Sequence, residues 1–160
     1  MSMFAKILDP IQRIYDWIGR IPYSAVVLPA RIATFSVFFR SGLVKIADWN
    51  ATLQLFRYEY KVPVLPPDFA AHMAAAMELG LSSLILVGLA TRLSVLGLLG
   101  MVAVIQVFVE PTGWPDHIQW VAFMLFILWR GPGVLSLDFL VGRLIGLPQS
   151  KAELPTDRMK

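Results

Sequence analysis

The feature that most constrains this chain is a series of four long apolar segments, at residues 26–47, 70–90, 93–109 and 114–129. A helix needs about 20 apolar residues to cross a bilayer, so four such helices would occupy about half of the chain of 160 residues. Only 16% of the residues are charged, whereas soluble domains have about a quarter. We therefore expect an all-α protein, a membrane four-helix bundle, in which the last span is the shortest.

Amphipathic segments are expected at both ends of the bundle. In residues 3–19, apolar residues recur at helical spacing with charged residues between them, which predicts a helix that lies in the membrane interface or packs on the bundle. This segment has neither a continuous apolar core nor a small-residue cleavage site, so we do not expect a signal peptide. Ser136 is expected to cap a second amphipathic helix over residues 137–147, and the tail from Pro148 is polar.

These features divide the chain into three parts. The parts are an N-terminal interfacial helix (1–25), a four-helix domain (26–133), and a C-terminal amphipathic helix with a polar tail (134–160). Within the domain, residues 48–67 combine aromatic residues with three prolines, which predicts an ordered loop at a membrane surface.

Lysine and arginine predict the orientation of the spans. With the N-terminus inside, nine of these residues fall on the cytoplasmic side and only two, Arg57 and Lys61, fall outside. We therefore expect a multi-pass protein of a bacterial cytoplasmic (inner) membrane with both termini in the cytoplasm. Because the basic residues adjoin apolar segments, membrane orientation explains them, and no nucleic acid partner is expected.

The chain contains no cysteine. Thiolate metal sites and iron–sulfur clusters are therefore not expected as intrinsic features. Any redox chemistry would depend on a bound molecule that carries the electrons.

Glu78 is the most informative single residue, because it lies inside the second apolar segment among small residues. A carboxylate in a membrane is costly and has to be paired or protonated. Its neighbours Ala75 and Gly80 would let another helix approach closely, so we expect Glu78 to face the bundle interior. Two interpretations stay open: proton exchange or hydrogen bonding with a bound headgroup, or a structural pair with a base on the first segment.

The first segment offers three bases. Lys45 is a candidate partner for Glu78 because Gly42 opens space one helical turn below it. Arg40 is closer to Glu78 in depth but lies on another face of the helix, and either residue could form the pair. Arg31 lies toward the cytoplasmic side, where its side chain is expected to extend to the interface.

The two histidines, His72 and His117, are both expected at the outer surface. Together with Met73, Met77 or Glu59 they could form a weak copper site, since imidazole and thioether groups suit copper. The alternative is that both are ordinary interfacial histidines near Trp114 and Trp120.

Three local motifs stand in order along the chain. They are Arg31 followed by residues 39–45 (FRSGLVK), Glu78-Leu79-Gly80 followed by residues 88–92 (GLATR), and Gly131-Pro132-Gly133 with Ser136-Leu137-Asp138. In this order they resemble the DoxX family of small four-helix membrane proteins. In addition, residues 59–67 (EYKVPVLPP) resemble the first loop of a DoxX branch associated with copper-responsive clusters that encode small metal-binding peptides.

This resemblance implies a four-helix membrane fold and suggests functions. Founding members of the family are described as subunits of thiosulfate:quinone oxidoreductase, and others are linked to oxidative or metal stress. Our leading hypothesis is a redox-accessory subunit that binds quinone or quinol in the bundle, is not catalytic alone and acts with a partner oxidoreductase. The alternatives are a non-catalytic membrane partner in copper or oxidative-stress handling, and a purely structural subunit.

The leading hypothesis assigns roles to eight residues. Glu78 and Lys45 would bind the headgroup or relay its proton. The residues expected to bind the cofactor or to shape the outer mouth of its site are Arg40, Ser41, Gly42, Trp49, Tyr58 and Tyr60.

Overall fold

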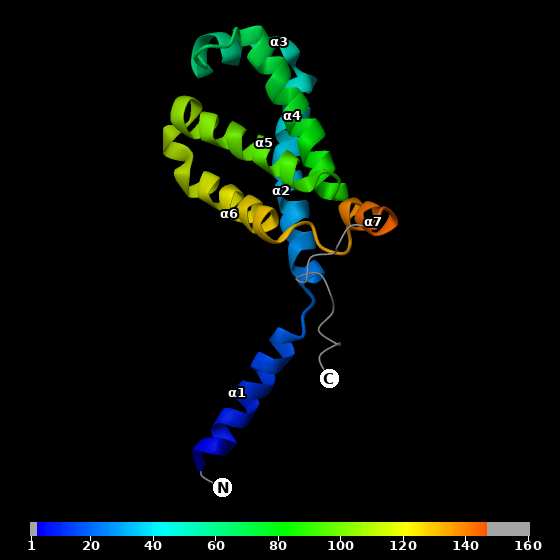
Figure 1. Cartoon of the computed structure of the whole chain (residues 1–160). Helices are drawn as coiled ribbons and strands as arrows, with labels where there is room; N and C mark the ends of the chain where they lie inside the picture. Colours follow the sequence, from blue (N-terminus) through cyan, green and yellow to red (C-terminus); the bar gives the residue numbers. More distant parts are fainter. Residues whose placement is uncertain (1–2, 147–160) are drawn as a thin grey trace.

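The computed structural model of this chain describes residues 3–146, with the side chains of residues 10–146. All regular elements in this range are helical, which confirms the predicted all-α class (Figure 1). The end of the second amphipathic helix at residue 147 and the polar tail lie outside the described residues. The elements are α1 (Met3–Gly19), α2 (Tyr23–Ala47), α3 (Trp49–Gln54), η1 (Leu55–Tyr60), α4 (Pro67–Val87), α5 (Thr91–Val104), η2 (Ile105–Val109), η3 (Pro111–Gly113), α6 (Trp114–Arg130) and α7 (Leu137–Leu144).

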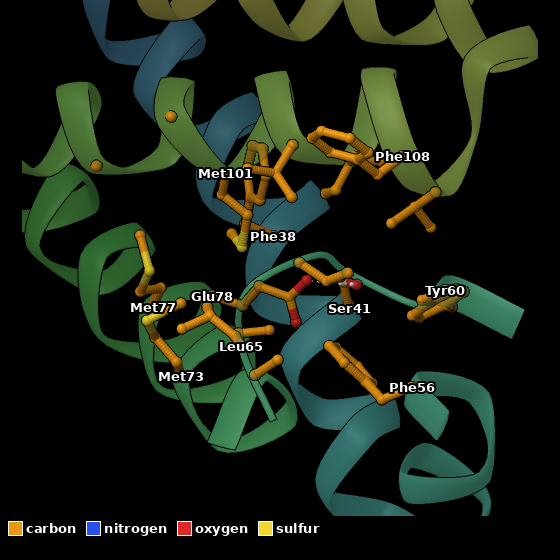
Figure 2. A pocket seen from close by; sticks show the side chains of 18 of the residues that line it. Phe38, Ser41, Phe56, Tyr60, Leu65, Met73, Met77, Glu78, Met101 and Phe108 are labelled. Atoms are coloured by element: carbon orange, nitrogen blue, oxygen red, sulfur yellow. Dashed lines mark hydrogen bonds between the residues drawn. The ribbon is translucent and has the colours of Figure 1, made fainter. Parts of the chain in front are cut away.

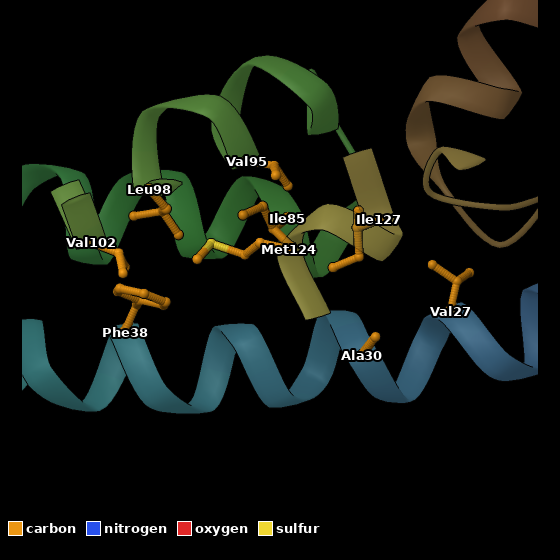
Figure 3. Close-up of a cluster of buried hydrophobic side chains, with 9 residues drawn as sticks. All are labelled: Val27, Ala30, Phe38, Ile85, Val95, Leu98, Val102, Met124 and Ile127. Carbon is orange, nitrogen blue, oxygen red and sulfur yellow. The ribbon is translucent and has the colours of Figure 1, made fainter. Parts of the chain in front are cut away.

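Helix α2 packs against α4 and α6, and α5 completes the bundle by packing against both α4 and α6 (Figure 1). Their buried apolar side chains form one core, shown in Figure 3, in which Phe38 and Val27 of α2 face Met124 and Ile127 of α6. The ring of Phe38 also contacts Trp120 edge-on, with 5.7 Å between ring centroids. The complete core cluster is Val27, Ala30, Phe38, Ile85, Val95, Leu98, Val102, Met124 and Ile127.

Within residues 3–146, three helices are long and apolar enough to cross a membrane. They are Tyr23–Ala47, Pro67–Val87, and the continuous helix Thr91–Val109 formed by α5 and η2. The fourth, α6, has 17 residues and packs against α2 and α5. This helix corresponds to the last predicted span, which the sequence analysis expected to be the shortest of the four.

Proline and glycine begin and end these helices. Pro22 and Pro66 directly precede α2 and α4, where a missing N–H does not interrupt the helix. Helix α4 ends at Gly88, whose φ of +73° is the left-handed conformation that favours glycine. The backbone N–H of Gly88 bonds to the carbonyls of Leu84 and Ile85 and so completes the last turn of α4.

Most of the segment that we expected to be a loop, residues 48–67, is helical. The carboxylate of Asp48 accepts a hydrogen bond of 2.9 Å from the N–H of Ala51 and caps α3. Phe56 in η1 is buried against Ala70 and Ala71 of α4. Only residues 61–66, which contain Pro63 and Pro66, have the extended and bent conformations of a loop. Pro63 and Pro66 thus follow the end of the helical segment at Tyr60, and they do not prevent helix formation in the residues before them.

The two terminal helices lie outside the core. Helix α1 projects away from the bundle, and residues 10–22 are exposed, including the apolar Ile14 and Ile18 (Figure 1). Of the two predicted arrangements for this helix, packing on the bundle is therefore not the one observed. The predicted cap of α7 is confirmed, since Ser136 Oγ accepts a hydrogen bond of 3.2 Å from the N–H of Phe139.

Candidate functional site

Arg31 is fully buried, with 1% of its surface exposed. Its guanidinium donates hydrogen bonds to four backbone carbonyls, so the expectation that it extends to the interface is wrong. The side chain instead joins the end of α4 to the segment between α6 and α7, and we call this region the α7 end of the bundle. The acceptors are Ile85 (2.9 Å), Leu86, Pro132 (3.0 Å) and Leu135 (2.7 Å).

The other residues of the second and third motifs meet at the same place. A Cβ at Gly88 would lie 2.4 Å from Cβ of Ser136 and 2.7 Å from Nη2 of Arg31, so this close approach requires glycine. The carboxylate of Asp138 accepts hydrogen bonds from the N–H groups of Ala90 (2.7 Å) and Thr91 (2.9 Å) and caps α5. Part of each motif therefore holds the α7 end together, which is a structural role.

Glu78 and Lys45 form an ion pair inside the bundle. Lys45 Nζ lies 2.8 Å from Glu78 Oε1, and the two side chains are 16% and 4% exposed. Ser41, one turn before Lys45 on α2, donates a hydrogen bond of 3.1 Å to the same oxygen and accepts one of 3.0 Å from Lys45. Lysine, serine and one carboxylate oxygen thus form a closed triangle of polar contacts.

The second oxygen of the same carboxylate has no partner. Glu78 Oε2 is buried and makes no hydrogen bond to any described residue. A buried carboxylate oxygen without a donor is unfavourable, because the solvation that it lost is not replaced. The position is therefore one at which a donor from a bound molecule would be stabilised.

Gly42 explains how α2 and α4 approach closely enough to form this pair. A Cβ at Gly42 would lie 2.7 Å from Cγ of Leu79 and 3.2 Å from Cβ of Glu78. Because glycine has no side chain, the two backbones come close together and the short reach from Lys45 to Glu78 becomes possible.

A cavity of about 880 Å³ lies beside the ion pair. Figure 2 shows Glu78 and Ser41 directed into it, with Met101 and Phe108 on the opposite wall. Its lining is mostly apolar and aromatic, and the volume is within the range of about 300–1,000 Å³ typical of small-molecule sites. The polar or charged residues among its lining are Ser41, Lys45, Tyr60, Glu78, Glu110 and Trp120.

Two π-helical segments border the cavity. Phe56 and Tyr60 come from η1, and Ile105 and Phe108 come from η2. The wider turn of a π-helix is uncommon and often occurs at functional sites. We call this end of the bundle, formed by residues 48–66 and 105–117, the α3 end.

Tyr60 lies at the α3 end of the cavity and is close to several carboxylates. Burial raises the pKa of its hydroxyl above the ordinary value, and the negative charges of Glu59, Glu78 and Glu110 raise it further. Tyr60 therefore stays protonated at neutral pH and can donate a hydrogen bond into the cavity.

The structure brings together four of the eight residues assigned from the sequence. Glu78, Lys45, Ser41 and Tyr60 line the cavity, and Gly42 lies behind them between α2 and α4.

The other three assigned residues are not among the lining of the cavity. Arg40 is exposed on another face of α2, so Lys45 is the base that pairs with Glu78. Tyr58 is 67% exposed. Trp49 packs edge-on against His72, with 4.4 Å between ring centroids.

The histidines make separate contacts. His72 is exposed, and its Nδ1 lies 2.7 Å from the carbonyl oxygen of Asp68. His117 is buried, and its Nδ1 lies 2.6 Å from Oε1 of Gln106. Among residues 10–146, no three His, Asp or Glu side chains are grouped in a way that could hold a metal ion. This result does not cover methionine sulfur, so a copper site that uses Met73 or Met77 stays a prediction.

Several cavity residues were not identified from the sequence. Met101, Phe108, Gly97 and Gly100 lie on α5 and η2, where the apolar pattern is continuous and does not distinguish the cavity face from the lipid face. Glu110 directly follows the third predicted span, and this position was the one available signal.

The fold and this site define a multi-pass helical membrane protein with a buried ion pair beside an apolar cavity. The DoxX family model matches residues 26–111, and the chain belongs to this family. It is also similar to an uncharacterized protein of Haemophilus influenzae, 29% identical over 117 residues that cover 67% of this chain and 77% of the relative. No solved structure matches the chain with significance.

Proposed function

We propose that this DoxX protein binds a quinone or quinol in the cavity beside Glu78 and works as an accessory subunit of a partner oxidoreductase. One observation carries the proposal: the unpartnered Oε2 of Glu78 is buried next to an apolar cavity of about 880 Å³. A flat apolar ring with one or two polar oxygens matches such a lining better than a strongly polar metabolite does.

The polar groups fit both forms of the ring. A quinol hydroxyl could donate a hydrogen bond to Glu78 Oε2, for which the described part of the chain offers no donor. A quinone carbonyl could accept one from Lys45 or Tyr60, both of which line the cavity and carry donors. A site with both an acceptor and donors can bind either redox state and accept or supply the proton that accompanies the change.

A partner oxidoreductase is part of the proposal because of the electron balance. Reduction of a quinone to a quinol takes up two electrons and two protons. Glu78 can pass protons, but the chain has no cysteine with which to carry the electrons itself. An oxidoreductase that oxidises its own substrate would supply them, and this subunit would provide the quinone site in the membrane.

The test is to purify the full chain in mild detergent, extract the bound lipophilic molecules and identify them by mass spectrometry. We expect near-stoichiometric quinone or quinol in the wild type and at least about tenfold less in Glu78→Gln. The matched control is Asp68→Asn, because Asp68 and Arg57 form an ion pair with the same N–O distance of 2.8 Å but with both side chains well exposed.

Each outcome decides between the hypotheses. Quinone retained by Asp68→Asn and lost from Glu78→Gln supports the proposed site. Equal retention in both variants would place quinone elsewhere and reject the role of Glu78. A wild type without quinone would leave the non-catalytic stress-linked partner as the better hypothesis, and metal analysis of the same sample would test its copper form.

A further inference from the structure

The cavity is open along part of the line where α4 and α5 meet. A Cβ at Gly97 would lie 2.6 Å from Cδ1 of Leu81, so the two helices are in close contact at that level. Nearly one turn farther along α5, a Cβ at Gly100 would meet no atom within 4 Å. Gly100 lines the cavity, and Figure 1 shows α4 and α5 diverging away from their short connection, so we infer that the helices separate beyond Gly97.

Side chains beside this separation line the cavity and are also exposed. Leu96 on α5 is 52% exposed, Phe108 on η2 is 50% exposed, and Met73 on α4 is 39% exposed. Both helices are long and apolar enough to cross a membrane, so apolar surface exposed along them contacts lipid. The cavity thus opens sideways into the bilayer.

The two walls of the cavity differ in polarity. The side formed by α2 and α4 carries Lys45, Ser41 and Glu78, whereas the lining residues of α5 and η2 are all apolar and the charge on that side is Glu110, directly after η2. A molecule bound here is therefore oriented, with its polar head at the ion pair and its apolar part along α5 and η2.

We propose that the cavity binds a long-chain lipid ligand that enters between α4 and α5, with its head at Glu78 and its tail passing Gly100 into the bilayer. The identity of the head as a quinone ring rests on the proposed function, but the path of the tail does not. The ligand class is thus narrowed to molecules with an isoprenoid or acyl tail, and a small water-soluble quinone is not the natural ligand.

Gly100 offers a direct test, because a Cβ added there would meet no atom within 4 Å. In Gly100→Phe the new ring would fill the passage, and replacing glycine inside a helix does not lower helix propensity. Gly80→Phe is the matched control: Gly80 is also helical, a Cβ there also meets no atom within 4 Å, and it does not line the cavity. Thermal unfolding in detergent verifies that both variants fold.

The first readout is the set of lipophilic molecules that co-purify with each variant, of whatever class, quantified by mass spectrometry. We expect the wild type and Gly80→Phe to retain a long-chain molecule, and Gly100→Phe to retain at least about tenfold less. Equal retention in Gly100→Phe would overturn the proposed path. A wild type that retains no long-chain molecule would also overturn it.

The same samples separate the path from the identity of the head group. If the wild type retains another long-chain lipid and not quinone, and Gly100→Phe loses it, the path stands and the proposed function fails.

The second readout is titration with a tailless dimethoxy-methylbenzoquinone and with a long-chain ubiquinone. We expect Gly100→Phe to weaken binding of the long-chain form alone. Equally weakened binding of the two quinones would mean that the substitution disturbs the site of the ring beside Glu78. That result would overturn the proposal that the tail passes Gly100, away from the ring.

Discussion

Lys45 on α2 and Glu78 on α4 form an ion pair in which only one of the two carboxylate oxygens takes part. Lys45 Nζ lies 2.8 Å from Oε1, while Oε2 is buried and has no hydrogen-bond partner among residues 10–146. A purely structural pair would be expected to use both oxygens, because each unpaired buried oxygen is unfavourable. The oxygen of Glu78 that accepts no hydrogen bond is therefore the feature of the fold on which the proposed ligand site rests.

The first prediction concerns the stability of this pair. Glu78→Gln leaves the Lys45 ammonium without its counter-charge, and Lys45→Met leaves the carboxylate alone, so each should lower the free energy of unfolding by about 3 kcal/mol or more. The double variant strands neither charge and should be more stable than either single variant. Thermal unfolding in detergent measures all four proteins, and strictly additive losses would show that the residues are not coupled.

The double variant also separates structure from function. Glu78→Gln with Lys45→Met should fold but still lack the retained quinone, because it removes the carboxylate and the ammonium that would bind the head group. Quinone retention equal to that of the wild type would mean that the pair is structural only.

A second prediction concerns Arg31. Arg31→Lys should destabilise the protein by about 2–4 kcal/mol, because a compact ammonium cannot reproduce the fork of donors that reaches four carbonyls on two segments. Arg40→Lys, on an exposed face of the same helix, should change stability by less than about 0.5 kcal/mol. Limited proteolysis of the segment between α6 and α7 provides a local measurement, and equal cleavage of the two variants would contradict the expectation.

A third prediction compares two glycines. Gly88→Ala introduces a Cβ that lies 2.4 Å from Cβ of Ser136 at a residue with φ of +73°, so we expect a loss of about 1–3 kcal/mol. Gly80→Ala adds a methyl group in open space within a regular helix and should stabilise the protein by about 0.5–1 kcal/mol. Unfolding of the two variants side by side tests this, and a neutral Gly88→Ala would argue against the tight contact.

A fourth prediction concerns pH. Burial and neighbouring carboxylates raise the pKa of Tyr60, so the folded state keeps this proton at pH values where the unfolded state loses it. Protonated Tyr60 therefore contributes its full stabilisation of the folded state below the ordinary tyrosine pKa of about 10. This contribution is lost as the pH rises through the higher pKa that Tyr60 has in the folded protein. The stability of the wild type should therefore fall above about pH 10 by more than that of Tyr60→Phe.

The control for this pH effect is Tyr58→Phe, because Tyr58 is 67% exposed. Its stability should follow the wild type across the same pH range, as measured by unfolding at fixed temperature. A Tyr60→Phe protein whose stability falls as steeply as that of the wild type would contradict the assignment.

The helical spans follow closely from the sequence, because the length of an apolar run and the positions of proline are local properties. The spans begin and end within a few residues of the expected boundaries, and Ser136 caps α7 as predicted. The segment 48–60 was the main exception. Its helix depends on the packing of Phe56 against α4, which is a long-range contact that no local pattern records.

The candidate site could be predicted only in part. Glu78 was recognisable because a carboxylate inside an apolar span needs a partner, and helical spacing reduced the possible partners to Lys45 and Arg40. Choosing between them required the rotation of α2 against α4, which depends on the close contact of Gly42 with Leu79. Arg31 was misassigned for the same reason. Its position along α2 does not reveal that its side chain faces the end of α4 and the segment between α6 and α7.

By itself, the sequence of this protein determined an all-helical membrane fold, the approximate spans and the need to compensate the carboxylate of Glu78 deep inside the second span. These properties depend on hydrophobicity, charge and residue order, which act along the chain. Tertiary structure alone decided that Lys45 is the partner, that Arg31 joins the α7 end, and that α4 and α5 separate at Gly100 to leave a cavity. Those properties depend on how helices rotate and approach one another, and close packing of side chains distant in sequence sets both.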